Sequence, residues 1–226
     1  RAAGGRVAGE GCDRMADDPL QDFLDRCPYR KFHPDSWAAI HETRAALLAE
    51  LKALADSGVR VDAPLRVFPA FWYHFGYDGL NDIEIQQAVS AFFQAVSPQI
   101  EYTAPHCALP GRPKRPGGRI RLGVCSTNLW SQTVGQYMIS LYWGLPKTRF
   151  EIVSIKPGNS PDDPEARLLD TLADRVVTTP PALGPARQAI AQLGCDAILF
   201  PDLGMNVPTY LLAQARLAPV QCVTFG

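Results

Sequence analysis

The sequence has no long apolar run and almost no net charge. No apolar stretch approaches the roughly 20 residues that a membrane-spanning helix needs, and the chain starts at Arg1 without a charged-then-apolar signal peptide. Its 22 basic and 23 acidic side chains leave a formal charge of −1, so no general attraction to nucleic acid or to a membrane is expected. These absences favour a soluble, cytoplasmic protein with neither nucleic acid nor a membrane as partner.

The sequence also lacks the motifs of several common sites. It has no Gly-x-Gly-x-x-Gly, no nucleophile elbow and no clustered pair of carboxylates. Its six cysteines are scattered without a Cys-x-x-Cys pair, and its four histidines have no metal-ligand spacing. We therefore expect no metal site. We expect reduced, buried cysteines, and Cys125, Cys195 and Cys222 in or beside apolar strands should behave as small hydrophobic residues.

What the sequence does contain divides into four parts. Residues 1–17 are rich in glycine, alanine and charge, which predicts a disordered tail. Residues 18–110 predict a helical region that leads into the rest of the chain. Residues 111–118 combine glycine, proline and basic side chains, as linkers do. Residues 119–226 change pattern and predict a separate lobe.

The helical region contains two clear amphipathic helices. The first follows Asp35 and Ser36, either of which can cap it, and it should end at Gly58. The second should begin at Asn81, a good N-cap residue, with Glu84 three positions later as in a capping box.

Strands and helices alternate from residue 119 onward. Apolar strands are expected at 120–125, 150–155, 176–178, 197–200 and 220–225, and helices at 134–145, 164–173, 185–193 and 210–215. Such alternation predicts a parallel sheet with right-handed crossovers. The predicted fold class is therefore α/β, a Rossmann-like parallel-sheet lobe preceded by an α-helical region.

Three polar loops follow predicted strands, and ligands of open α/β sheets bind beyond the carboxyl ends of strands. The loop 126–133 places backbone N–H groups at a helix N-terminus, which suits an anion or a sugar hydroxyl. Asn128 and Thr133 are its candidate substrate-binding residues.

The other two loops follow the fourth and fifth strands. Asp202 could accept hydrogen bonds from hydroxyl groups, or bond to its own backbone in an Asx turn. Gly204 beside it permits close approach of a ligand to the backbone, and Gly226 begins the next cleft-lining loop.

The same segments carry a family resemblance. Phe200-Pro-Asp-Leu-Gly-Met205 followed by Arg216-Leu-Ala-Pro-Val-Gln-Cys-Val-Thr-Phe-Gly226 resembles glycosyltransferase family 41, the protein O-GlcNAc transferase and Spindly-like group. In that family an Asp-x-Gly turn precedes Arg-x-Ala-Pro-x-Gln and a glycine-rich loop. Gly79-Leu-Asn-Asp82 and Tyr102-Thr-Ala-Pro-His-Cys107 are also similar to the family, so the resemblance covers about residues 65–226.

The resemblance implies half of a two-lobed GT-B glycosyltransferase, with residues 119–226 as its N-terminal lobe, truncated at the C-terminal end. It implies inverting transfer of GlcNAc from UDP-GlcNAc to a Ser or Thr hydroxyl of a protein acceptor, with no metal or other cofactor. In the family the C-terminal lobe holds most of the donor, and the cleft and preceding helical (TPR) repeats contact the acceptor. The isolated chain is therefore expected to be inactive.

One position departs from the family pattern. A histidine that faces the cleft normally precedes the Thr133-Val134-Gly135 segment, and this chain has Gln132 there. Glutamine exchanges hydrogen bonds but cannot take up a proton near neutral pH. Gln132 therefore either orients substrate, marks a non-catalytic binding or scaffold homologue, or only caps the helix. A UDP-hexose transferase with another acceptor is a further possibility.

Overall fold

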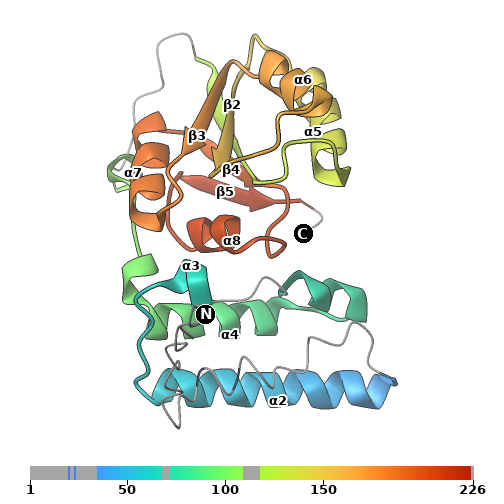
Figure 1. Cartoon of the computed structure of the whole chain (residues 1–226), viewed down its shortest axis with the longest axis vertical. Coiled ribbons are helices and arrows are strands. Elements are labelled where there is room, and N and C mark those ends of the chain that lie inside the picture. Colours follow the sequence, from blue (N-terminus) through green and yellow to red (C-terminus); the bar gives the residue numbers. More distant parts are fainter. Residues whose placement is uncertain (1–19, 21–22, 24–34, 68–71, 109–117, 225–226) are drawn as a thin grey trace, which may run out of the picture.

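The computed structural model describes residues 20, 23, 35–67, 72–108 and 118–224. Figure 1 shows an α/β unit stacked on a smaller helical unit. The predicted tail, most of the predicted linker and Gly226 lie outside the described residues.

The helical unit precedes the α/β unit in the chain. Its α-helices are α2 (Trp37–Asp56), α3 (Pro64–Val67) and α4 (Ile83–Val96), and its 3-10 helices are η2 (Trp72–Asp78), η3 (Pro98–Ile100) and η4 (Pro105–Cys107). The α/β unit contains β1 (Ile120–Cys125), α5 (Thr133–Gly144), β2 (Phe150–Pro157), α6 (Pro164–Leu172), β3 (Arg175–Thr179), α7 (Leu183–Leu193), β4 (Ala197–Phe200), α8 (Val207–Ala213) and β5 (Val220–Val223). No helix of the described part is long and apolar enough to cross a bilayer.

The five strands form one parallel sheet in the order β3-β2-β1-β4-β5. In the central strand β1, Leu122 pairs with Ile152 of β2 on one side and with Ala197 of β4 on the other. The chain runs outward from β1 to β3 and then returns to the other side of β1 for β4. The topological switch point therefore lies between β1 and β4. This sheet confirms the predicted α/β, Rossmann-like fold class.

Helices cover both faces of the sheet. Neighbouring residues of β1 point to opposite faces, so Val124 joins the apolar cluster with Met138 and Tyr142 of α5. Cys125 joins the other cluster, with Ile190 of α7 and Leu212 of α8. Figure 1 shows α5 and α6 side by side, with α7 and α8 apart from them. The central strands of the sheet are therefore buried on both faces, which explains why their sequences are continuously apolar.

The edge strand β5 differs from the prediction of a buried strand with a buried thiol. Val220 is 56% exposed and Val223 is 50% exposed, and Cys222 is also exposed. The reason is that β5 pairs with β4 on one side and has no strand on its other side among the described residues. Cys125 and Cys195 are free and buried, as expected.

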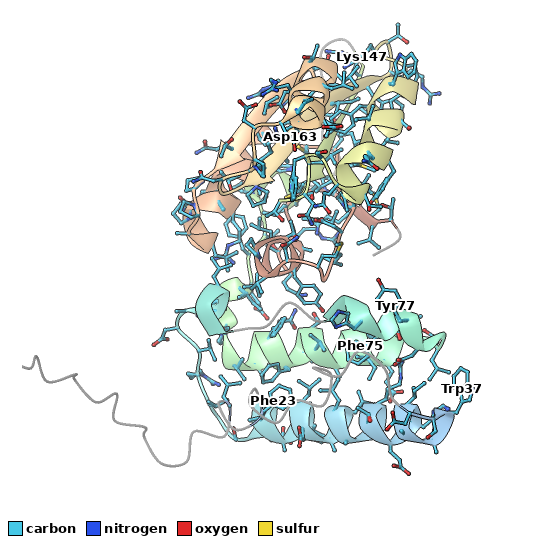
Figure 2. The ribbon with its side chains drawn as sticks, turned by 45° about the vertical axis from the view of Figure 1, so that its right-hand side comes forward. Phe23, Trp37, Phe75, Tyr77, Lys147 and Asp163 are labelled. Atoms are coloured by element: carbon cyan, nitrogen blue, oxygen red, sulfur yellow. The ribbon has the colours of Figure 1, made fainter. Side chains whose placement is uncertain are left out.

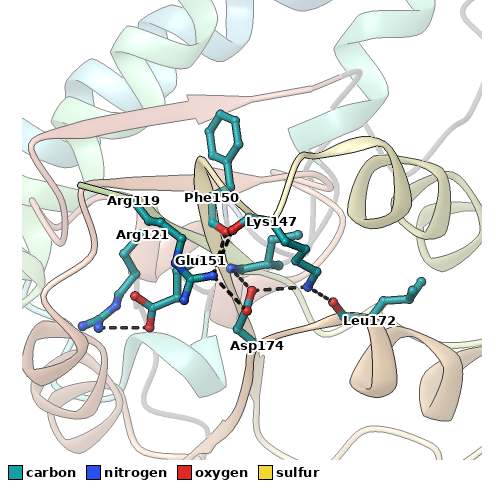
Figure 3. A network of polar contacts seen from close by, with 8 residues as sticks. Arg119, Arg121, Lys147, Phe150, Glu151, Leu172 and Asp174 are labelled. Atoms are coloured by element: carbon teal, nitrogen blue, oxygen red, sulfur yellow. Dashed lines mark hydrogen bonds and ion pairs between the residues drawn. The ribbon is translucent and has the colours of Figure 1, made fainter. Parts of the chain in front are cut away.

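Polar contacts gather at the amino-terminal edge of the sheet (Figure 3). The carboxylate of Asp174 contacts Arg119 Nη1 at 3.2 Å and Lys147 Nζ at 3.3 Å, and it accepts from the Ile152 backbone N–H at 2.8 Å. Burial alone would raise the pKa of Asp174, but these hydrogen bonds outweigh it and lower the pKa. Charges at this edge are therefore paired with one another.

Helices α2 and α4 pack together through buried apolar residues, which include Leu47, Leu51, Leu54, Ile85, Val89, Phe92 and Phe93. Figure 2 shows Phe23 and Phe75 inside this unit and Trp37 at the outer end of α2. As predicted, Ser36 caps α2, and its Oγ accepts from the Ala39 N–H at 3.2 Å.

The start of α4 is shifted by one residue from the prediction. Its N-cap is Asp82 rather than Asn81. The Asp82 carboxylate does not cap the helix, because it accepts a hydrogen bond from Arg44 at 2.8 Å. Asn81 instead accepts from the Ile83 N–H through its side chain at 3.0 Å.

Helix α8 connects the two units, and Figure 1 shows it between the sheet and α4. The ring of Tyr210 meets Phe93 edge-on with centroids 5.6 Å apart, and its hydroxyl donates to Gln86 Oε1 at 2.8 Å. Ser90 Oγ donates to Gln214 Oε1 at 2.5 Å. Tyr210 and Leu211 of the α/β unit therefore belong to the apolar core of the helical unit.

Candidate functional site

Two loops meet at the carboxyl ends of the neighbouring strands β1 and β4. Ser126 follows β1 directly, and Asp202 lies two residues beyond the end of β4. Both side chains are fully buried. Because the strand order reverses between β1 and β4, this is the place where open α/β sheets form a ligand crevice.

Asp202 ties the two loops together through one carboxylate oxygen. Its Oδ2 accepts from Ser126 Oγ at 2.8 Å and from Asn128 Nδ2 at 2.6 Å, with Asn206 Nδ2 at 3.4 Å. Ser126 Oγ also accepts from the Asn128 backbone N–H at 2.8 Å, which fixes the loop after β1. The prediction of an Asx turn is therefore incomplete, since the main partners of Asp202 come from the other loop.

The second oxygen of Asp202 has no such support. Oδ1 is buried and has no hydrogen-bond partner among the residues that the structure describes. Burial raises the pKa of Asp202, and the hydrogen bonds from Ser126, Asn128 and Asn206, with a weaker contribution from its own backbone N–H, oppose that rise without cancelling it. A buried carboxylate oxygen without a donor is costly, and a hydroxyl or N–H group of a ligand would satisfy it.

The turn that carries Asp202 needs its glycine. Gly204 has a φ of +92°, which side chains rarely adopt. The Met205 N–H donates to the Asp202 carbonyl at 3.1 Å and closes the turn. The Tyr137 hydroxyl of α5 donates to the Pro201 carbonyl at 2.6 Å. These contacts hold the Asp202 turn against the helix that follows β1.

The loop after β1 folds tightly onto the first turn of α5. A Cβ placed on Gly135 would lie 1.9 Å from the Trp130 carbonyl oxygen, so only glycine fits. Gln132 is the N-cap residue of α5, with an extended backbone and a half-buried side chain. That side chain makes no capping hydrogen bond. The interpretation of Gln132 as a helix cap therefore holds for its backbone position alone.

The structure brings together only part of the predicted site. Asn128 and Asp202 are in direct contact, and Gly204 forms the same turn as Asp202. The side chains of Gln132 and Thr133 form no hydrogen bond with that group among the described residues, and Thr133 is exposed.

Three residues of this arrangement were not predicted from the sequence. The sequence could have indicated two of them. Ser126 is the first residue after a predicted strand, and Asn206 follows the predicted turn at Gly204. Nothing in the sequence indicates Tyr137, because its contact depends on how α5 lies over β4. Within the described ranges, no group of three or more His, Cys, Asp or Glu residues could hold a metal ion.

No protein-family model and no curated protein matches the sequence. A solved structure of a mutant O-GlcNAc transferase from Thermobaculum terrenum is similar, with a TM-score of 0.53 and 15% sequence identity. The similarity covers 82% of this chain and 34% of that one, so this chain spans about a third of the length of the transferase. At this identity the likeness shows the fold alone. The fold of this chain is glycosyltransferase-like.

Proposed function

We propose that this chain is the N-terminal lobe and preceding helical region of a glycosyltransferase that moves GlcNAc from UDP-GlcNAc to a Ser or Thr hydroxyl of an acceptor protein. The observation that carries the proposal is the buried Asp202 at the switch point, with one oxygen held by both loops and the other without a donor. The glycosyltransferase-like fold supports the reaction class. The sequence similarity of residues 200–226 to family 41 supports the finer assignment.

The proposed reaction inverts the configuration at C1 of the sugar. The acceptor hydroxyl oxygen bonds to C1 of GlcNAc, the bond from C1 to the diphosphate oxygen breaks, and UDP leaves with the bonding electrons. In this proposal Oδ1 of Asp202, which is buried in the structure, becomes accessible when the acceptor binds, and it accepts the hydroxyl proton. Its raised pKa suits this role, because a general base works best when its pKa lies nearer the working pH. Stabilisation of the departing diphosphate requires donors or cations, which the proposal assigns to the rest of the protein.

Gln132 has an orienting role in this proposal. Its amide is half-buried and unused by the helix cap, so it is available to donate or accept a hydrogen bond with a substrate hydroxyl. It takes no proton. Asn128 holds Asp202 in place rather than contacting the reacting atoms, since its amide already donates to Oδ2.

The same Gln132 favours a second candidate function. A binding or scaffold homologue could keep the crevice for recognition of a UDP-sugar or a protein without any transfer. Transfer of another hexose from UDP to a different acceptor is compatible with the same site, because no contact of Asp202 among the described residues selects the 2-acetamido group.

The test is UDP release by the complete protein, wild type beside Gln132→His, with UDP-GlcNAc or UDP-glucose as donor and a protein acceptor. Gln136→His is the matched control, since Gln136 is exposed one turn along the same helix. Turnover by the wild type with UDP-GlcNAc is expected. Binding without turnover, together with turnover by Gln132→His alone, would establish the binding homologue. Failure to bind either donor would contradict sugar transfer and also the recognition of a UDP-sugar.

A further inference from the structure

A second hollow lies between the helical unit and the start of α7, away from the Asp202 turn. Its volume is about 630 Å³. Its walls include Asp62, Pro64 and Leu65 from the helical unit, and Leu183, Gly184 and Arg187 from the first turns of α7. The proposed sugar transfer makes no use of these residues.

Arg187 is a buried cation in this hollow, and no acidic side chain of the described residues forms an ion pair with it. It is 9% exposed. Its Nη1 donates to the Ile100 carbonyl at 2.7 Å and its guanidinium carbon lies 5.4 Å from the ring centre of Tyr102, but its Nε has no hydrogen-bond partner in the described chain. Burial lowers the pKa of Arg187, and the interaction with Tyr102 opposes that shift without cancelling it. A buried charge that lacks an ionic partner is expensive to keep.

The N-terminus of α7 opens onto the same hollow. The N–H groups of Leu183 and Gly184 have no partner within their own helix. The N-cap residue, Ala182, has no side chain that could cap them. The positive end of the helix dipole therefore adds to the positive charge of Arg187.

The remaining walls restrict the ligand. Pro64, Leu65 and Leu183 present apolar surface, which suits an apolar body next to the charged group. Asp62, which is exposed and forms no ion pair with Arg187, repels a ligand with two negative charges more than a ligand with one. A planar monoanion fits the fork of a guanidinium, since both oxygens can accept from it.

We propose that this hollow is a binding site for the carboxylate of a small organic acid, held by Arg187 and the first N–H groups of α7. The site goes beyond the proposed sugar transfer and does not depend on it. Asp202→Asn should leave it intact, so that failure of one proposal is separable from failure of the other.

The first test is a titration of the full chain followed by ¹H–¹⁵N NMR, with hexanoate as probe. Hexanol is the matched control, because it has the same apolar body without the charge. Hexanoate should shift the Gly184 N–H and Arg187 Nε–H signals in a saturable way, with a Kd at least ten times lower than that of hexanol or inorganic phosphate. Equal binding of hexanol and hexanoate, or no shift at these two groups, would overturn the proposal.

The second test places a carboxylate in the site. A Cβ on Gly184 meets nothing within 4 Å and its backbone is not left-handed, so Gly184→Glu and Gly184→Gln both fit. Residue 184 lies three positions before Arg187 on the same helix face. Glutamate should weaken hexanoate binding at least ten-fold more than glutamine does. In an Arg187→Gln background, the difference between the effects of glutamate and glutamine should vanish. Equal effects of Gly184→Glu and Gly184→Gln in the wild-type background would show that the charge of the ligand plays no part in binding.

Discussion

At the scale of single residues, the central feature is the carboxylate of Asp202, whose charged form is disfavoured by burial. Buried polar groups are normally hydrogen-bonded, yet one oxygen of this carboxylate has no donor among the described residues. Ser126 and Asn128 satisfy the other oxygen and fix its direction. A buried charged group that is held in a fixed position despite its unfavourable burial is typical of binding or catalytic sites.

This cost predicts a pH-dependent effect of Asp202→Asn. The pKa of Asp202 is raised above 3.8 in the folded chain, so the folded state holds its proton to higher pH than the unfolded state. The stability that the protonated carboxyl group of Asp202 contributes is therefore fully present below pH 3.8. It is lost as the pH rises through the pKa of the folded state. The asparagine of the variant does not titrate, so its contribution to stability does not change with pH. Urea unfolding at pH 4, 5.5 and 7 should show the variant gaining stability relative to the wild type as the pH rises.

The difference between the two proteins at pH 7 should be within about 1 kcal/mol, because asparagine keeps an oxygen for Ser126 and Asn128. If the stability of Asp202→Asn relative to the wild type instead stayed flat or fell with rising pH, the Asp202 carboxylate would not be destabilised by burial.

At the scale of elements, the shape of the site depends on how closely the loop after β1 packs on α5. Gly135 makes this possible, because its position leaves no room for a Cβ beside the Trp130 carbonyl. In the same loop, Ser126 and Asn128 donate to the carboxylate of Asp202. The resemblance to family 41 identified Gly135 by its place in a motif, and the structure supplies the physical reason.

Gly135→Ala should therefore destabilise the chain by about 3 kcal/mol, because the clash is with backbone that cannot move without the loop. Gly144→Ala is the control in the same helix, since a Cβ there meets nothing within 4 Å. That control should be neutral or stabilising by up to about 1 kcal/mol. Chemical unfolding of both variants measures the two values, and similar values for both would contradict the packing argument.

The elements themselves could be predicted because their apolar patterns are local. The strand at 120–125 and the helix that begins beside residue 133 follow from runs of apolar residues and a change of period. The contact between Asn128 and Asp202 could not, because it requires the strand order, which places β1 beside β4. Exposure of Cys222 could not be predicted either, since an edge strand and a central strand have similar apolar sequences.

At the scale of the whole molecule, the two units should unfold together. Tyr210 on α8 is buried against Phe93 and donates to Gln86, so the core of the helical unit includes a residue of the α/β unit. The backbone adds to this connection, since Ala104 N–H donates to the Arg216 carbonyl at 2.8 Å. The carboxyl edge of the sheet is therefore held in a fixed relation to the helices.

Tyr210→Ala should destabilise the chain by about 3–5 kcal/mol through the cavity it leaves. Tyr210→Phe, which removes only the hydroxyl, should cost about 1 kcal/mol. The wild type should show one transition in calorimetry with coincident near- and far-UV circular dichroism. Two separate transitions in the wild type would contradict a shared core.

The proposed sugar transfer depends on Asp202 as the group that accepts the acceptor proton. The most direct test is the rate of UDP release by the complete protein with UDP-GlcNAc and a protein acceptor, wild type against Asp202→Asn. We expect turnover by the wild type and a loss of at least about 100-fold in the variant with the fold unchanged, because the group that accepts the proton is removed. Equal rates in the two proteins would contradict this role of Asp202.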